Sequence, residues 1–227
     1  PGNAGWQRDL SVSYDRVGNV LVAQGQLPDA LKAFRDSLAI REKLAKADPG
    51  NAVWQRDLSV SQEKIGNVLV AQGQLPDALK AFKDSLAIRE KLTKADPGNA
   101  GWQRDLSVSY DRVGNVLVAQ GQLPDALKAF RDSLAIREKL AKADPGNAGW
   151  QRDLSVSYDR VGDVLVAQGN LPDALKAYRD SQTIVDKLAK ADPGNAGWQR
   201  DLSVSYDRVG DVLVAQGNLP DALKAYR

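Results

Sequence analysis

The 227-residue sequence contains no cysteine, no histidine and no methionine. Without cysteine and histidine the chain cannot form disulfides, thiol nucleophiles, cysteine or histidine metal sites, or imidazole acid–base centres. No apolar run approaches the roughly 20 residues that a transmembrane helix needs, and no stretch has the pattern of a signal peptide. We therefore expect a cytoplasmic protein that uses no metal and no cofactor.

An excess of charge of one sign is also missing. The 31 lysines and arginines nearly balance the 29 aspartates and glutamates, which leaves a net charge of +2. The two signs alternate along the chain, whereas a nucleic-acid or membrane-binding surface gathers basic residues in patches. The charge pattern predicts a solvated surface and excludes nucleic acid and membranes as partners.

A 48-residue pattern returns along the whole chain. Its tryptophans lie at Trp6, Trp54, Trp102, Trp150 and Trp198. Such a period predicts stacked supersecondary units with no domain boundary between them. We therefore expect one array over residues 1–227, with repeats 1–48, 49–96, 97–144 and 145–192 and a partial repeat 193–227.

Each repeat predicts two helices, here named helix A and helix B. In the first repeat Asn3 suits a helix N-cap, and apolar residues then return at helical spacing to about Gln24. Gly25 predicts the end of helix A, and Pro28 predicts the start of helix B, which runs to about Ala47. Two long helices joined by a short turn must lie antiparallel, and one hairpin cannot bury both apolar stripes. The pattern predicts an all-α solenoid.

These residues resemble the tetratricopeptide repeat, in the lengthened form of kinesin light chains. The order of the family's 34-residue signature is followed by Tyr14, Val17, Gly18, Leu21, Gly25, Ala30, Phe34, Ser37 and Pro49. Residues 37–43 also resemble the end of the second helix in kinesin light chain repeats, whereas Gln62 departs from the aromatic signature position. The resemblance implies a right-handed superhelix of antiparallel helix hairpins, with helix A lining a concave groove.

The resemblance also implies which residues line a peptide-binding groove on helix A. They are Arg8, Val12, Asp15, Asn19, Val22, Arg56, Val60, Glu63, Asn67, Val70, Arg104, Val108, Asp111, Asn115, Val118, Arg152, Val156, Asp159, Asp163, Val166, Asp207 and Asp211. Among them, Asn19, Asn67 and Asn115 match the asparagine that, in this family, forms hydrogen bonds with the backbone of a bound peptide. Asp163 and Asp211 replace it, which makes the last part of the groove more acidic.

The charge of this face favours some peptides over others. Clamps for acidic C-terminal peptides need lysine where Asp15 and its equivalents stand, so the resemblance implies a basic or mixed peptide. The plainer alternative is a solvated helix face with no ligand. Asp9 and Asp15 cannot act as a paired acid and base, because six helical residues place them about 120° apart.

Two functions stay open at this stage. The first is a protein- or peptide-binding scaffold that catalyses no reaction. The second is a structural or engineered repeat with no specific ligand, which self-associates head to tail through uncapped apolar ends.

Overall fold

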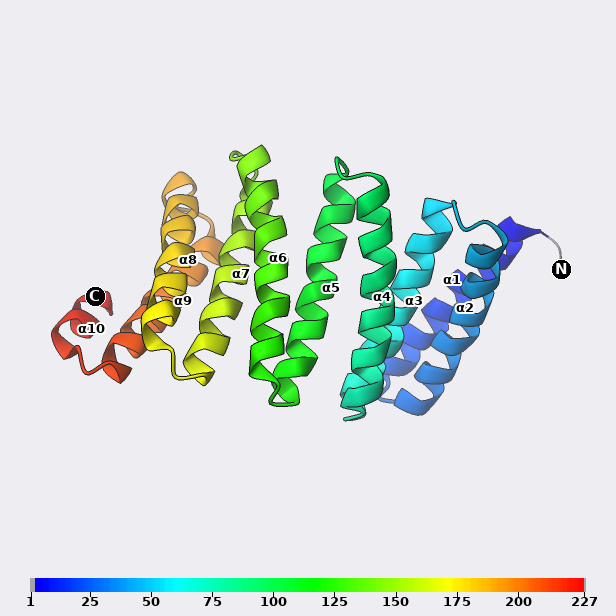
Figure 1. The fold of residues 1–227 in the computed structure, drawn as a ribbon, viewed down its shortest axis with the longest axis horizontal. Helices are drawn as coiled ribbons and strands as arrows, with labels where there is room; N and C mark the ends of the chain where they lie inside the picture. Colours follow the sequence, from blue (N-terminus) through cyan, green and yellow to red (C-terminus); the bar gives the residue numbers. More distant parts are fainter. Residues whose placement is uncertain (1–2, 227) are drawn as a thin grey trace. The chain divides into compact units, whose positions relative to one another are not determined.

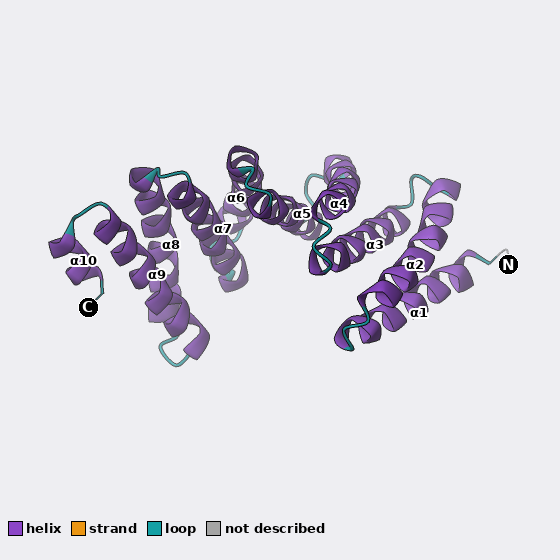
Figure 2. Ribbon diagram, turned by 90° about the horizontal axis from the view of Figure 1, so that it is seen from below, coloured by secondary structure: helices purple, strands orange, loops and turns teal. Residues whose placement is uncertain are grey.

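The computed structural model describes residues 3–226, and these residues form helices and loops without a strand (Figures 1 and 2). The helices are α1 (Ala4–Ala23), α2 (Leu27–Ala47), α3 (Ala52–Ala71), α4 (Leu75–Ala95), α5 (Ala100–Ala119), α6 (Leu123–Ala143), α7 (Ala148–Ala167), α8 (Leu171–Ala191), α9 (Ala196–Ala215) and α10 (Leu219–Ala225). The odd-numbered helices are helices A of the repeats, and the even-numbered helices are helices B. The predicted all-α fold is confirmed. The predicted starts and ends of the first two helices, α1 and α2, agree with the structure to within one residue.

The ends of the helices follow the predicted local chemistry. The Asn51 side-chain oxygen accepts the backbone N–H of Trp54 at 3.2 Å, and the other repeats use the equivalent asparagine in the same way. After α1 the chain turns through Gly25, whose φ of 75° is a left-handed conformation that suits glycine. These signals lie within a few residues of each boundary, which explains why the sequence predicts the helices so well.

The described chain divides into two compact units, Pro1–Gln120 and Gly121–Arg227. In the N-terminal unit, α1 packs on α2, α2 on α3, α3 on α4 and α4 on α5. In the C-terminal unit, α6 packs on α7, α7 on α8, α8 on α9 and α9 on α10. Within the two units, α2, α4 and α8 therefore each lie between their own helix A and the helix A that follows.

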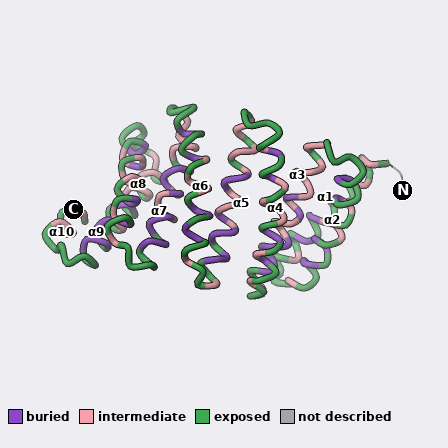
Figure 3. Tube along the Cα trace, in the orientation of Figure 1, coloured by how far each residue is buried: buried purple, intermediate pink, exposed green. Residues whose placement is uncertain are grey.

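The core lies along these packed faces (Figure 3). Phe34 of α2 is 2% exposed, and its ring lies against Gly18 of α1, where a side chain would collide with it. In α3 the predicted apolar stripe is buried, with Ile65, Val68 and Leu69 each at most 6% exposed. Small residues opposite aromatic ones let helices A and B approach closely.

The apolar stripe of α1 is the exception. Leu10, Val17 and Val20 are 49%, 51% and 57% exposed. In the interior helices A a preceding helix B covers the equivalent positions. No such helix covers α1 within the N-terminal unit.

Candidate functional site

The predicted groove residues differ in burial. Those exposed are Asn19, Val22, Arg56, Asn67, Val70, Arg104, Asn115, Val118, Arg152, Asp163, Val166, Asp207 and Asp211. Those partly buried are Arg8, Val12, Val60, Glu63, Val108, Val156 and Asp159. Asp15 and Asp111 are buried, at 7% and 4% exposure. The asparagines, the second valine of each repeat, three of the four arginines and three of the aspartates thus form the open part of this surface.

Asp15 is buried because an arginine of helix B reaches it. Arg41 of α2 donates from Nη2 to Asp15 Oδ2 at 2.8 Å. It also donates to Ser11 Oγ at 3.1 Å, to the Asp57 carbonyl at 3.0 Å and to Ser61 Oγ at 2.8 Å. One guanidinium therefore joins α1, α2 and α3, and a buried charge with such partners is tolerated.

The second repeat contains the same network. Arg89 of α4 donates to Glu63 Oε2 at 2.7 Å, to Ser59 Oγ at 3.3 Å, to the Asp105 carbonyl at 2.9 Å and to Ser109 Oγ at 2.8 Å. Sequence analysis did not identify these arginines as structural residues. Their position three residues before a core leucine of helix B is the signal that could have shown it.

The predicted groove arginines also have partners within the array. Arg8, Arg56 and Arg152 each donate to an aspartate of the next helix A, 49 residues along the chain. The pairs are Arg8–Asp57 at 2.6 Å, Arg56–Asp105 at 3.0 Å and Arg152–Asp201 at 2.6 Å. The hydrogen bond to the carboxylate raises the pKa of Arg8 and of Arg152. We call these three pairs the arginine–aspartate ladder.

The fourth repeat lacks the buried arginine. Val185 stands where Arg41 stands in the first repeat, and it is 3% exposed. Asp159, the equivalent of Asp15, therefore receives no guanidinium from α8, and it lies 4.0 Å from Nη1 of Arg208. Burial raises the pKa of the Asp159 carboxyl.

The predicted acidic positions of the last two repeats bond within the C-terminal unit. Asp163 Oδ1 accepts from the Tyr178 hydroxyl and from Arg208 Nη1, both at 2.7 Å. Asp211 Oδ1 likewise accepts from the Tyr226 hydroxyl at 2.7 Å. In the three repeats with asparagine here, the aromatic residue is phenylalanine. The change to aspartate therefore accompanies a change to tyrosine.

A pocket of about 190 Å³ opens between α1, α2 and α3. Its lining residues are Asn19, Val22, Leu27, Phe34, Lys64, Asn67, Val68 and Ala71. Lys64 Nζ lies 5.2 Å from the centroid of the Phe34 ring, donates to Asn19 Oδ1 at 3.3 Å and lies 3.5 Å from Asp15 Oδ2. Three predicted groove residues thus meet at an apolar pocket, and sequence analysis missed Lys64, Phe34 and Leu27 as its neighbours.

Two further features are absent from residues 3–226. This part of the chain brings together no cluster of acidic residues able to hold a metal ion. None of its helices is both long enough and apolar enough to cross a membrane.

Comparison with known proteins agrees with this geometry. A family model described as the tetratricopeptide repeat matches residues 9–91 and 57–139, which together cover more than half of the chain. The chain belongs to the tetratricopeptide repeat family. Members of this family are in general scaffolds that bind peptides or proteins and do not catalyse reactions. No curated protein sequence matches the chain.

Solved tetratricopeptide-like structures share the fold at low sequence identity. BtubC (BKLC) from P. vanneervenii is 14% identical, with a TM-score of 0.73 over 96% of this chain and 78% of that one. A putative kinesin light chain of Podosopora anserina with nearly identical tetratricopeptide-like repeats is 17% identical, with a TM-score of 0.66 over 96% and 92%. The predicted resemblance to lengthened tetratricopeptide repeats is confirmed.

Proposed function

We propose that this tetratricopeptide array is a non-catalytic scaffold that binds an extended peptide segment of a partner protein. The pocket between α1 and α3 carries this proposal, because apolar and hydrogen-bonding groups converge there. Its volume of about 190 Å³ is smaller than the roughly 300–1,000 Å³ of a site for a drug-sized ligand. It suits a single apolar side chain.

Two amides at the rim of the pocket supply contacts for a peptide backbone. Asn19 and Asn67 are exposed and belong to consecutive helices A. Asn19 accepts from Lys64 through Oδ1, so its amide nitrogen keeps two donors for a ligand carbonyl. One apolar side chain in the pocket and backbone bonds on either side of it form a minimal recognition unit for an extended peptide.

The burial of the carboxylates changes the expected charge of the ligand. Asp15 and Glu63, which favour a basic peptide in the sequence, form ion pairs with Arg41 and Arg89. Their charges are compensated before a ligand arrives. We therefore propose a peptide centred on an apolar residue, with no strong requirement for basic residues beside it.

Selection from a random 12-residue peptide library displayed on phage tests the proposal. We expect the selected peptides to share one apolar residue, and Asn67→Ala to weaken their binding about tenfold, as loss of a backbone hydrogen bond in a partly desolvated site would. The same variant should unfold at the urea concentration of the unchanged chain, because the Asn67 amide is exposed.

Lys32→Ala is the matched control. Lys32 is exposed on α2 and pairs with Asp36 of the same helix, away from the pocket. Peptides that bind equally to the unchanged chain and to Asn67→Ala would show that the pocket is not the site. Failure to enrich any sequence would count against peptide binding itself.

End-to-end self-association is a second candidate function. The observation that favours it is the open face of α1, where Leu10, Val17 and Val20 are about half exposed. An exposed apolar face on a repeat array tends to be covered by another repeat, of the same chain or of a second copy.

A further inference from the structure

We propose that three residues determine whether the space between two consecutive helices A admits an apolar side chain of a bound peptide. One residue lies on a helix A, one on its helix B and one on the next helix A. In the N-terminal unit Asn19, Phe34 and Lys64 leave this space open. Their equivalents in the C-terminal unit close it. The inference rests on the proposed peptide-binding function and names the residues that set its specificity.

The open pocket is lined mainly by apolar groups. Lys64 Nζ lies 5.2 Å from the centroid of the Phe34 ring, donates to Asn19 Oδ1 at 3.3 Å and lies 3.5 Å from Asp15 Oδ2. Phe34 has no hydroxyl, so its ring and Val68 present only carbon to the pocket. An apolar side chain can therefore enter the volume of about 190 Å³ without breaking a bond between two charged groups.

This pocket is independent of the uncovered apolar face of α1. Its lining residues include none of Leu10, Val17 and Val20, which form that face. Val22 lines the pocket and is 41% exposed, and its equivalent Val70 in the interior helix α3 is also 41% exposed. The pocket therefore belongs to the joint between two repeats.

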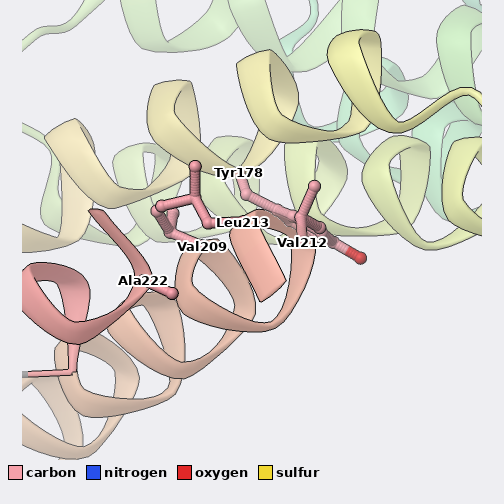
Figure 4. Packing of buried hydrophobic residues seen from close by; sticks show 5 residues of the cluster. All are labelled: Tyr178, Val209, Val212, Leu213 and Ala222. Atoms are coloured by element: carbon pink, nitrogen blue, oxygen red, sulfur yellow. The ribbon is translucent and has the colours of Figure 1, made fainter. Parts of the chain in front are cut away.

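The equivalent site in the C-terminal unit carries Asp163, Tyr178 and Arg208. Asp163 Oδ1 accepts from the Tyr178 hydroxyl and from Arg208 Nη1, both at 2.7 Å. The guanidinium lies 5.4 Å from the centroid of the tyrosine ring. The ring packs beside Val212, the equivalent of Val68, and its hydroxyl points out of the apolar cluster (Figure 4). The added hydroxyl and the larger guanidinium thus extend into the space that is a pocket in the N-terminal unit.

Opening the C-terminal site would break strong hydrogen bonds. Both contacts of Asp163 are shorter than the 3.3 Å between Lys64 and Asn19, as expected where a carboxylate accepts. Burial and the bond to Asp163 raise the pKa of Tyr178, so its hydroxyl stays protonated and donates. An apolar side chain offers no hydrogen bond in exchange and would leave these groups unsatisfied. The C-terminal site should therefore reject the apolar residue that the N-terminal site binds.

Methyl NMR of the 227-residue chain, with N-acetyl-leucine methylamide as the probe, tests the inference at both sites. The probe presents one apolar side chain between two amide groups, as a residue within a peptide does. We expect it to shift the methyl signals of Val22 and Val68 and to leave those of Val166 and Val212 unchanged. Single valine-to-isoleucine substitutions assign the four residues.

The N-terminal exchange gives the open site the residues of the closed one. It combines Asn19→Asp, Phe34→Tyr and Lys64→Arg. The probe should then bind at Val22 and Val68 about tenfold more weakly, because it must break a bonded set of charged and hydroxyl groups. The folded C-terminal unit already accommodates these residue types, so this variant should fold, and thermal unfolding checks that it does.

The C-terminal exchange is the reverse test. It combines Asp163→Asn, Tyr178→Phe and Arg208→Lys. With the carboxylate and the hydroxyl removed, the probe should shift the methyl signals of Val166 and Val212. This gain of binding cannot result from a loss of fold.

Arg179→Lys is the matched control, because it changes an exposed arginine of α8 outside the three positions and should leave both sites as they are. A probe that shifts neither Val22 nor Val68 in the unchanged chain would overturn the pocket as a binding site, and this inference with it. Equal shifts at both sites of the unchanged chain, or exchanges that alter neither site, would overturn the three-residue inference alone and leave peptide binding at the pocket standing.

Discussion

Arg41 and Arg89 are each 4% exposed, which is unusual for the most strongly hydrated class of side chain. Burial of a charge is unfavourable unless an opposite charge and hydrogen bonds compensate it. Here a carboxylate, two serine hydroxyls and a backbone carbonyl of the next repeat do so. Each arginine therefore bonds groups of two consecutive helices A, so its burial depends on how one repeat packs on the next.

Asp15 and Asp159 occupy the same position in two repeats, yet replacing each with asparagine should change the free energy of unfolding in opposite directions. Asp15→Asn leaves the buried Arg41 without its anion and should lower the free energy of unfolding by about 3 kcal/mol. Asp159→Asn should raise it at pH 7, because Asp159 has no arginine from α8 and burial penalises its charged form. Urea unfolding of the two variants at pH 7 measures both effects.

The effect of Asp159→Asn on stability should depend on pH, and the direction follows from the raised pKa of Asp159. The pKa of Asp159 is higher in the folded chain than its ordinary value of 3.8, so the folded state binds this proton more tightly. The protonated form stabilises the fold below the unfolded pKa, and that stabilisation is lost as pH rises through the folded pKa. The advantage of Asp159→Asn should therefore shrink as pH falls through the raised pKa of the folded chain toward about 4, and it should be largely gone below that pH. An advantage that is constant from pH 7 to pH 3 would contradict the assignment.

At the scale of the helices, close packing of A on B depends on one glycine in each repeat. A Cβ added to Gly66 of α3 would lie 2.7 Å from Cε1 of Phe82 in α4. That aromatic side chain is 2% exposed and has no room to move aside. The helix propensity that alanine would add is smaller than the cost of this overpacking.

Gly66→Ala should accordingly lower the free energy of unfolding by about 1–3 kcal/mol. Gly101→Ala is the matched control in α5, because the equivalent residue in α3 is Val53, which is 54% exposed. This control should be neutral or slightly stabilising. Denaturant titration of both variants compares them, and equal effects would show that the contact between glycine and phenylalanine does not limit helix packing.

At the scale of the whole molecule, each repeat is stabilised by its neighbours as well as by its own hairpin. In the C-terminal unit α9 covers α8, and α10 packs on α9. A chain that ends at residue 192 should lose these contacts and expose Tyr178, which is 5% exposed in the 227-residue chain. Nearest-neighbour energetics then predict a lower melting temperature and a smaller urea m-value.

Circular dichroism during heating and urea titration of the two chains measure both quantities. The chain that ends at residue 192 keeps four complete helix pairs, so it should still fold. An unchanged melting temperature would indicate that the repeats fold independently and that their interfaces add little.

Much of the fold could be predicted because its determinants are local. Asn3, Gly25 and Pro28 act within one turn of the helix ends that they specify, and the 48-residue period repeats those signals. The apolar stripe of helix A was predicted correctly for the interior helices. The candidate site was predicted less well. Its amides Asn19 and Asn67 are exposed beside a pocket, whereas Asp15 lies inside the network of Arg41.

By itself the sequence determined the period, the helices and their ends, since each depends on short-range chemistry. Only the tertiary structure decided which charged residues face water. Arg41 lies on the apolar side of helix B, and Asp15 lies on the face of helix A away from its apolar stripe, so the periodicity of a single helix does not show that the two charges meet. The packing of one helix on another determines the outcome, because a partner charge at 2.8 Å makes burial tolerable and its absence does not.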